Sequence, residues 1–255
     1  MFAPPYDDQV IHTEIPKPKK TIYSQYIKRL LDIVLSGLAI VVLSPLLLLL
    51  CILELIFHGR PIFYIDQRPG LNGEIFGLYK FRSMNNARDE NGNLLHASKR
   101  ITPFGRMLRR TSLDELAGLF NIFNGTMSIV GPRPLMKQYL PLYSERHKYR
   151  HCVRPGLACW KVGGSNELSS STWTWNAQFE SDIYYVEHIS FLLDCWMVLK
   201  TVKILFTKSE MRTNADRIRF DGKNLLETRP RHVIMAELEK QAEAEKNSEA
   251  KSDGE

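Results

Sequence analysis

One apolar segment, residues 33–57, limits what this 255-residue chain can fold into more than any other feature of its sequence. The segment is long enough to cross a bilayer and lies too far from the N-terminus to be a signal peptide. Ser44 and Pro45 near its middle predict a break, because proline removes a backbone hydrogen bond and a neighbouring serine satisfies part of the freed backbone. Basic residues flank both ends, so the positive-inside rule favours neither crossing direction. We therefore predict a re-entrant helix-hairpin broken at Ser44 and Pro45, with one kinked spanning helix as the alternative.

The remaining sequence divides around this segment. We expect a flexible tail at residues 1–20, a basic flank and membrane hairpin at 21–58, a main domain at 59–206 and a C-terminal extension at 207–255 that is low in complexity at its end. No second apolar run reaches membrane length. The predicted fold is therefore mixed α/β, a small cytoplasmic domain seated on the membrane through amphipathic interfacial helices.

Charge and cysteine content limit the partners. A net charge of +6 favours acidic partners, which include nucleic acid, anionic lipid and phosphorylated substrates. No helix-turn-helix, RNP, KH or zinc-finger pattern is visible, so we expect no nucleic-acid partner. The four cysteines lack CxxC spacing and are interpreted as reduced, buried small hydrophobes in a cytoplasmic setting, without a zinc site: Cys51, Cys152, Cys159 and Cys195.

The main domain shows short alternating elements. Strands are predicted at residues 61–65 and 74–84, the second placing Lys80 and Arg82 on one face. An exposed loop follows at 85–100, then a short amphipathic helix at 102–108. Residues 134–150 are predicted to be helical with a solvated charged face, and 157–162 to form a strand. The apolar segment 182–206 predicts either an interfacial helix or a buried core helix, with His188 structural.

Two adjacent carboxylates, Asp114 and Glu115, follow a pair of arginines. Ser112 and Glu115 match the capping box that opens a helix, with Ser112 as the N-cap residue. Carboxylates in a first helical turn can serve as caps alone. A helix N-terminus beside arginines also binds phosphate, and an aspartate held there can attack phosphorus or bind a divalent cation. These residues alone leave both interpretations open.

A second motif, Gly131-Pro132-Arg133-Pro134, places an arginine between two prolines. The prolines restrict the backbone and aim the guanidinium, which suits bidentate phosphate binding, although Gly-Pro turns with an incidental arginine are common.

Together the motifs of residues 25–206 resemble, in order and spacing, the monotopic bacterial sugar transferases, which are polyprenyl-phosphate phosphoglycosyl transferases. The segments that carry the resemblance are Lys28-Arg29 with Asp32, Ser44-Pro45, Gln67-Arg68-Pro69-Gly70, Lys80-Phe81-Arg82-Ser83-Met84, Ser112-Leu113-Asp114-Glu115-Leu116, Gly131-Pro132-Arg133-Pro134-Leu135, Arg154-Pro155-Gly156 and Asp182-Ile183-Tyr184-Tyr185-Val186.

The resemblance implies transfer of a sugar-1-phosphate from a UDP-sugar to polyprenyl (undecaprenyl) phosphate with release of UMP. That reaction is the first membrane step of capsule, O-antigen or exopolysaccharide synthesis. It further implies a location at the cytoplasmic face of a bacterial inner membrane, with membrane lipid and downstream glycosyltransferases as partners; a homodimer is left open.

For individual residues, the resemblance implies that Asp114 is the nucleophile of a covalent intermediate and that Asp114 and Glu115 bind Mg2+. The substrate-phosphate or nucleotide-binding residues it suggests are Lys80, Arg82, Arg109, Pro132, Arg133 and Arg154.

The sequence departs from the family pattern after Arg154-Pro155-Gly156, where residues 157–162 read LACWKV in place of the common Ile-Thr-Gly-Trp-Ala-Gln. This departure leaves the donor sugar open. One rival is a catalytically silent membrane scaffold, in which Asp114→Asn would cost only about 1 kcal/mol of stability through a lost cap. A soluble aspartyl-phosphate phosphatase is disfavoured, because the Asp-x-Asp loop after a hydrophobic strand is missing and the apolar run is present.

Overall fold

The structure, a computed structural model, describes residues 11–95, 97–159, 174–206 and 220–226. Its α-helices are α1 (Lys28–Val42), α2 (Ser44–Phe57), α3 (Ala97–Arg100), α4 (Pro103–Thr111), α5 (Gly118–Asn124), α6 (Glu145–Lys148), α7 (Trp175–His188) and α8 (Phe191–Phe206). A π-helix, Tyr23–Ile27, precedes α1, and 3-10 helices span Leu71–Gly73, Leu113–Ala117, Lys137–Leu142 and Tyr149–Cys152. The strands are β1 (Phe63–Pro69), β2 (Ile75–Phe81), β3 (Ser128–Val130) and β4 (Gly156–Ala158).

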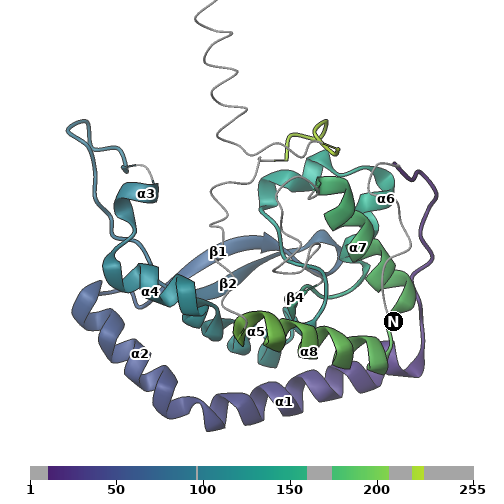
Figure 1. Cartoon of the computed structure of the whole chain (residues 1–255), viewed down its shortest axis with the longest axis horizontal. Coiled ribbons are helices and arrows are strands. Elements are labelled where there is room, and N and C mark those ends of the chain that lie inside the picture. Colours follow the sequence, from purple (N-terminus) through teal and green to yellow (C-terminus); the bar gives the residue numbers. More distant parts are fainter. Residues whose placement is uncertain (1–10, 96, 160–173, 207–219, 227–255) are drawn as a thin grey trace, which may run out of the picture.

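The apolar segment forms two helices that meet at a wide bend along one edge of the molecule (Figure 1). Leu43 leaves the helical conformation, Pro45 lies in the first turn of α2, and the Ser44 hydroxyl donates to the Val41 carbonyl at 2.7 Å. The break therefore lies at the predicted serine and proline. Among the described residues no single helix has the length and apolar character to cross a membrane. The pair Tyr23–Val42 and Ser44–Phe57, bent by 64°, meets those criteria only when taken together.

Two small sheets lie above the bent helices. β1 and β2 form an antiparallel hairpin with Phe63 opposite Phe81 and Pro69 opposite Ile75, whereas β3 pairs in parallel with β4. The strands predicted at residues 61–65 and 74–84 are confirmed, but β1 continues to Pro69, beyond its predicted end at residue 65. The turn comes later, at Leu71–Gly73, where Asn72 and Gly73 have positive φ angles of 54° and 79°.

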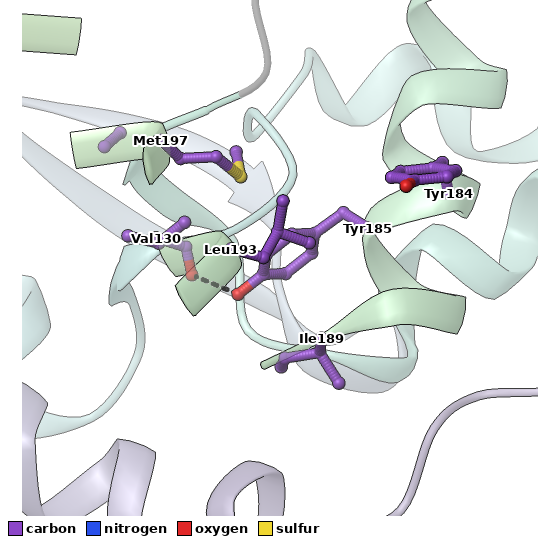
Figure 2. Packing of buried hydrophobic residues seen from close by; sticks show 7 residues of the cluster. Val130, Tyr184, Tyr185, Ile189, Leu193 and Met197 are labelled. Atoms are coloured by element: carbon purple, nitrogen blue, oxygen red, sulfur yellow. Dashed lines mark hydrogen bonds between the residues drawn. The ribbon is translucent and has the colours of Figure 1, made fainter. Parts of the chain in front are cut away.

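Helices α7 and α8 replace the single long helix expected near the C-terminal end of the domain. Tyr185, Leu193 and Met197 pack with Val130 in one core cluster, and the Tyr185 hydroxyl donates to the Val130 carbonyl at 3.2 Å (Figure 2). Four large hydrophobic residues of α8 instead remain exposed: Phe191, Leu192, Leu199 and Val202. Helix α8 therefore has one face in the core and one apolar face outside it, so each alternative describes part of this helix.

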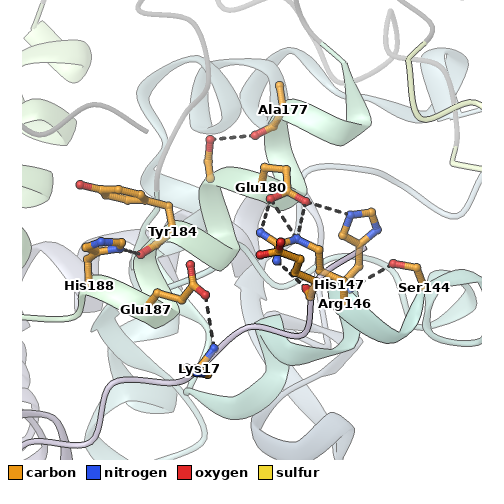
Figure 3. Close-up of polar contacts among 11 residues, drawn as sticks. Lys17, Ser144, Arg146, His147, Ala177, Glu180, Tyr184, Glu187 and His188 are labelled. Atoms are coloured by element: carbon orange, nitrogen blue, oxygen red, sulfur yellow. Dashed lines mark hydrogen bonds and ion pairs between the residues drawn. The ribbon is translucent and has the colours of Figure 1, made fainter. Parts of the chain in front are cut away.

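The predicted solvated face at residues 134–150 is wrong for its arginines. Arg146 and Arg150 are only 5% and 2% exposed. Arg146 forms an ion pair with Glu180 of α7 at 2.7 Å (Figure 3), and Arg150 pairs with Asp182 of the same helix at 2.6 Å. The carboxylates of α7 make burial of these charges tolerable, since a buried ion must be paired.

The predictions for the cysteines, the N-terminal tail and His188 can also be compared with the structure. All four cysteines are free, but only Cys159 is buried, while Cys152 and Cys195 are exposed. The part of residues 1–20 that the structure describes runs along α7, where the Lys19 amide donates to the Val186 carbonyl at 3.0 Å. His188 stacks on Tyr184, as a structural residue would. The expectations for residues 1–10, 160–162, 207–219 and 227–255 lie outside the described residues.

Candidate active site

The carboxylate pair lies where α4 ends and the next helical segment begins. Thr102 is the N-cap residue of α4, and its hydroxyl accepts from the Gly105 amide at 2.9 Å. Ser112, in the left-handed region with φ of 56°, is the C-cap residue. Leu113–Ala117 then forms a 3-10 helix that leads into α5. The predicted capping box is wrong, because the Ser112 side chain makes no cap hydrogen bond and its backbone instead terminates α4. Asp114 and Glu115 nevertheless lie in a first helical turn.

The hydrophobic neighbours of the pair attach it to the bent helices. Leu113, Leu116 and Ala117 pack in the same cluster as Leu47 and Leu50 of α2. Phe81 at the end of β2 and Leu108 of α4 complete the buried part of that cluster. The carboxylates are therefore held by one core shared among α2, α4 and the β-hairpin.

Cations from three separate elements gather at the carboxylates. Glu115 Oε1 lies 3.7 Å from Lys80 Nζ of β2 and 3.5 Å from Arg133 Nη2 of the loop after β3. Arg109, in the last turn of α4, donates from Nε to the Ser83 hydroxyl at 2.7 Å. A group that carries negative charge on several oxygens, such as a diphosphate, fits among these donors.

The electrostatic environment makes Asp114 more basic than an ordinary aspartate. Burial and the neighbouring Glu115 charge raise the pKa of Asp114, while Lys80 and Arg109 oppose that shift. Burial lowers the pKa of Lys80, and Glu115 opposes the change. Attraction to Glu115 raises the pKa of Arg133 above its ordinary value. Ionisable groups with shifted pKa values that gather at one place are typical of functional sites.

Arg133 is held through the backbone of its loop. The Pro132 carbonyl accepts from the Gly156 amide at 2.9 Å, and the Arg133 carbonyl accepts from Arg150 Nη2 at 2.7 Å. A Cβ on Gly156 would lie 2.0 Å from the Gly131 nitrogen, so only glycine permits this approach. Through Arg150 the ion pair with Asp182 connects α7 to the site.

Two predicted phosphate-binding residues lie elsewhere. Arg82 donates to the carbonyls of His58 and Pro61, both at 3.2 Å, and so secures the chain after α2. Arg154 donates to the Gly125 carbonyl at 2.8 Å, at the C-terminus of α5, where cations are favoured. Both guanidinium groups thus bind backbone carbonyls and do not join the cluster around Glu115.

Two residues that lie at the site, Arg68 and Ser83, were not predicted individually from the sequence. Arg68 lies close enough to lower the pKa of Lys80 and reaches the Pro134 carbonyl at 3.5 Å. Ser83 orients Arg109. The motifs at 67–70 and 80–84 contain both residues, but only the folded structure shows which of their side chains lie near Lys80 and Arg109.

Comparison with known proteins bears on what this cluster does. A family model described as bacterial sugar transferase matches residues 23–208. The chain belongs to the bacterial sugar transferase family. The family predicted from the motifs is thereby confirmed, and the matched segment contains the bent helices, the carboxylate pair and α8.

Three relatives illustrate the range of this sugar transferase family. The chain is 40% identical over 190 residues to the uncharacterized sugar transferase EpsL of Bacillus subtilis, covering 74% of this chain and 92% of EpsL. It is 32% identical over 200 residues to the Aeromonas hydrophila UDP-N-acetylgalactosamine-undecaprenyl-phosphate N-acetylgalactosaminephosphotransferase, covering 76% and 46%. It is 36% identical over 190 residues to the Xanthomonas campestris UDP-glucose:undecaprenyl-phosphate glucose-1-phosphate transferase, covering 71% and 39%. The chain thus spans less than half the length of the latter two enzymes.

Proposed function

We propose that this sugar transferase moves a sugar-1-phosphate from a UDP-sugar to polyprenyl phosphate, releasing UMP. The observation that carries the proposal is the half-buried carboxylate pair surrounded by Lys80, Arg109 and Arg133 on a core shared with α2. The names of the two longer relatives, which specify UDP-sugars and undecaprenyl phosphate, support the same substrates here. The product would then serve glycosyltransferases that extend the glycan.

In the first step an Asp114 carboxylate oxygen attacks the phosphorus that bears the sugar. The bond between that phosphorus and the bridging oxygen of the diphosphate breaks, and UMP leaves. Asp114 then carries the phosphosugar as an acyl phosphate. The raised pKa of Asp114 makes its ionised form a better nucleophile, and Lys80 and Arg109 reduce the repulsion between carboxylate and phosphate.

In the second step an oxygen of polyprenyl phosphate attacks the same phosphorus. The bond to Asp114 breaks, which gives the lipid diphosphosugar and restores the carboxylate. Glu115 is held by Lys80 and Arg133 and so is placed to orient these cations toward the phosphate in both steps. Two successive displacements predict ping-pong kinetics.

Asp114 and Glu115 are also the residues that would hold Mg2+. This ion is commonly bound by one or two carboxylates together with substrate phosphates, so a pair of adjacent carboxylates is sufficient. The part of the chain that the structure describes offers no larger cluster of metal-binding side chains. The raised pKa of Asp114 fits a place where a further positive charge is favourable. When bound, the ion supplies charge neutralisation at the diphosphate.

We further propose that α1 and α2 enter the cytoplasmic leaflet and return as a re-entrant hairpin. The outward residues of both helices are apolar and exposed, among them Leu38, Val41, Leu48 and Ile52. The exposed apolar face of α8 is suited to the membrane interface. Such a placement brings the carboxylates to the depth of a lipid phosphate while they stay open to a cytosolic nucleotide sugar.

The test is UMP release by the purified full chain from a panel of UDP-sugars with undecaprenyl phosphate and Mg2+. Wild type should release UMP from at least one donor, and Asp114→Asn should release none. Glu145→Gln, at an exposed carboxylate of α6, is the matched control and should behave as wild type. Equal activity in Asp114→Asn would contradict the nucleophile, and a silent wild type would favour the scaffold alternative.

A further inference from the structure

Glu54 is a carboxylate buried in the apolar helix α2. The residue is 0% exposed, and Leu47 and Leu50 of the same helix belong to the core that holds the carboxylate pair of the site. Glu54 Oε2 lies 2.8 Å from His58 Nδ1, one helical turn later, whereas Oε1 is buried without a hydrogen-bond partner among the described residues. A buried carboxylate with an unsatisfied oxygen costs stability, because the water it has lost is not fully replaced. Glu54 therefore calls for an explanation other than stability.

His58 connects this carboxylate to the start of α4. Its side chain is fully buried, and its Nε2 lies 2.8 Å from the hydroxyl oxygen of Thr102, the N-cap residue of α4. That hydroxyl accepts from the Gly105 amide and still has a hydrogen to donate. A neutral imidazole satisfies both neighbours, because Nδ1 can donate to the carboxylate while Nε2 accepts from the hydroxyl. Glu54, His58 and Thr102 thus form one hydrogen-bonded chain from α2 to α4.

The same histidine also contacts two other elements. The Arg82 guanidinium, just after β2, donates to the His58 carbonyl at 3.2 Å. Phe104 of α4 lies beside the His58 ring with centroids 5.8 Å apart, and Phe57 of α2 stacks on Phe104 at 4.8 Å. The end of α2, the end of β2 and the start of α4 therefore meet at His58.

Helix α4 carries this connection to the active site. Its Gly105 lies so close to the chain after β2 that a Cβ there would be 2.0 Å from the Ser83 carbonyl oxygen. In the last turn of α4, Arg109 donates to the Ser83 hydroxyl at 2.7 Å, and the 3-10 helix with Asp114 follows. Because a short helix moves as a unit, the anchor at Thr102 helps to set where Arg109 lies relative to Asp114.

We propose that Glu54 and His58 are positioning residues for transfer of the phosphosugar. Acting through Thr102, they hold α4 so that Arg109 stays at its working distance from Asp114. The inference rests on the proposed function for its reaction. A cation stabilises charge in a transition state only where it is correctly placed in advance, and a misplacement of about 1 Å can slow a reaction on the order of 100-fold.

The experiment removes the polar chain without leaving a buried charge. In the double variant Glu54→Leu with His58→Phe, both side chains are apolar, so folding should be preserved, and the new ring can pack on Phe104. Thr102→Gly is a second variant, which removes the hydroxyl while glycine remains an acceptable N-cap residue. Glu54→Gln is the matched control, because its amide oxygen can still accept from Nδ1.

The values of kcat and of KM for the UDP-sugar would be measured from UMP release by the full chain, with thermal unfolding as the check on folding. We expect the double variant and Thr102→Gly to lower kcat by about tenfold or more. KM should stay within about threefold, because Lys80 and Arg133 still bind the phosphates. Glu54→Gln should keep both values within about threefold of wild type. Wild-type kcat in the folded double variant and in Thr102→Gly would overturn the proposal.

A second arm tests whether the effect passes through Arg109. Arg109→Lys should itself lower kcat, and the double variant should cause little further loss in a chain that already carries Arg109→Lys. The same fold-loss with and without Arg109→Lys would overturn the proposed route.

Hydrogen exchange of the α4 amides tests the anchor independently of the reaction. The full chain in phospholipid nanodiscs should exchange faster at residues 105–109 in the double variant than in wild type or Glu54→Gln. Unchanged exchange in the double variant would contradict an anchor at the start of α4. A wild type that releases no UMP would refute the proposed reaction, whereas the exchange measurement would still decide whether His58 holds this helix.

Discussion

Replacing Arg150 with methionine tests whether α7 supports the site through a buried ion pair. The Arg150 guanidinium donates to Asp182 at 2.6 and 3.0 Å and to the Arg133 carbonyl at 2.7 Å. Methionine retains much of the side-chain volume but donates no hydrogen bond. Asp182, whose side chain is 1% exposed, would then be a buried carboxylate without its cation.

Breaking a buried pair by removing one partner costs about 3–5 kcal/mol. For a chain of this size each kcal/mol corresponds to roughly 2–4 °C, so the melting temperature should fall by on the order of 6–20 °C. Removing both charges in Arg150→Met with Asp182→Leu should return most of that stability, because an apolar pair of similar volume replaces an ion pair at little cost. UMP release should stay low in the double variant, since the Arg133 carbonyl still lacks its donor.

Thermal unfolding and UMP release would be measured on the two single variants and on the double variant. Lys148→Met, which removes an exposed pair with Glu145, is the control and should change stability by less than about 0.5 kcal/mol. Recovery of stability and activity together in the double variant would show that Arg150 acts only through folding. A single variant as stable as wild type would refute the argument from burial.

Three further predictions concern other residues. The pKa of His151 is about 4 in the folded state and near 6.5 in the unfolded state. The free energy of unfolding should therefore be unaffected above pH 6.5 and fall by up to about 3 kcal/mol on acidification to pH 4. Urea titrations should show a smaller loss in His151→Gln. Gly105→Ala would put a methyl group 2.0 Å from the Ser83 carbonyl oxygen, so α4 must shift. UMP release should be lost, and the free energy of unfolding should fall by about 1–3 kcal/mol. A variant with unchanged activity and stability would contradict this close packing of α4 against Ser83. Ser112→Gly relieves a left-handed backbone and should raise the unfolding free energy by up to about 1 kcal/mol in thermal denaturation, whereas a loss would show that the serine side chain contributes there.

Local signals in the sequence were sufficient for several elements. The short helix predicted at residues 102–108 is found as α4, and Ser44 and Pro45 predict the break between α1 and α2. Both are cases in which the deciding interactions lie within a few residues along the chain. The motifs likewise identified Lys80, Arg109 and Arg133, which the structure brings to the carboxylate pair.

The roles of other residues depend on tertiary contacts that the local sequence does not show. Arg82 and Arg154 have the same chemistry as Arg133, and only the positions of distant carbonyl groups show that they bind backbone. Arg150 reads as a surface charge until Asp182, thirty-two residues later, is placed against it. Ser112 was assigned as a cap because its spacing to Glu115 fits a capping box, but the packed end of α4 forces it into a left-handed turn.

The measurement that tests the central claim most directly is the mass of the intact full chain after incubation with its UDP-sugar and Mg2+ in the absence of polyprenyl phosphate. The account predicts an added mass of one sugar phosphate, located on Asp114 by fragmentation, together with one UMP released per chain. Addition of polyprenyl phosphate should remove the adduct, and Asp114→Asn should never acquire it. UMP release that occurs only with the lipid acceptor, without any adduct during a single turnover, would contradict the covalent mechanism.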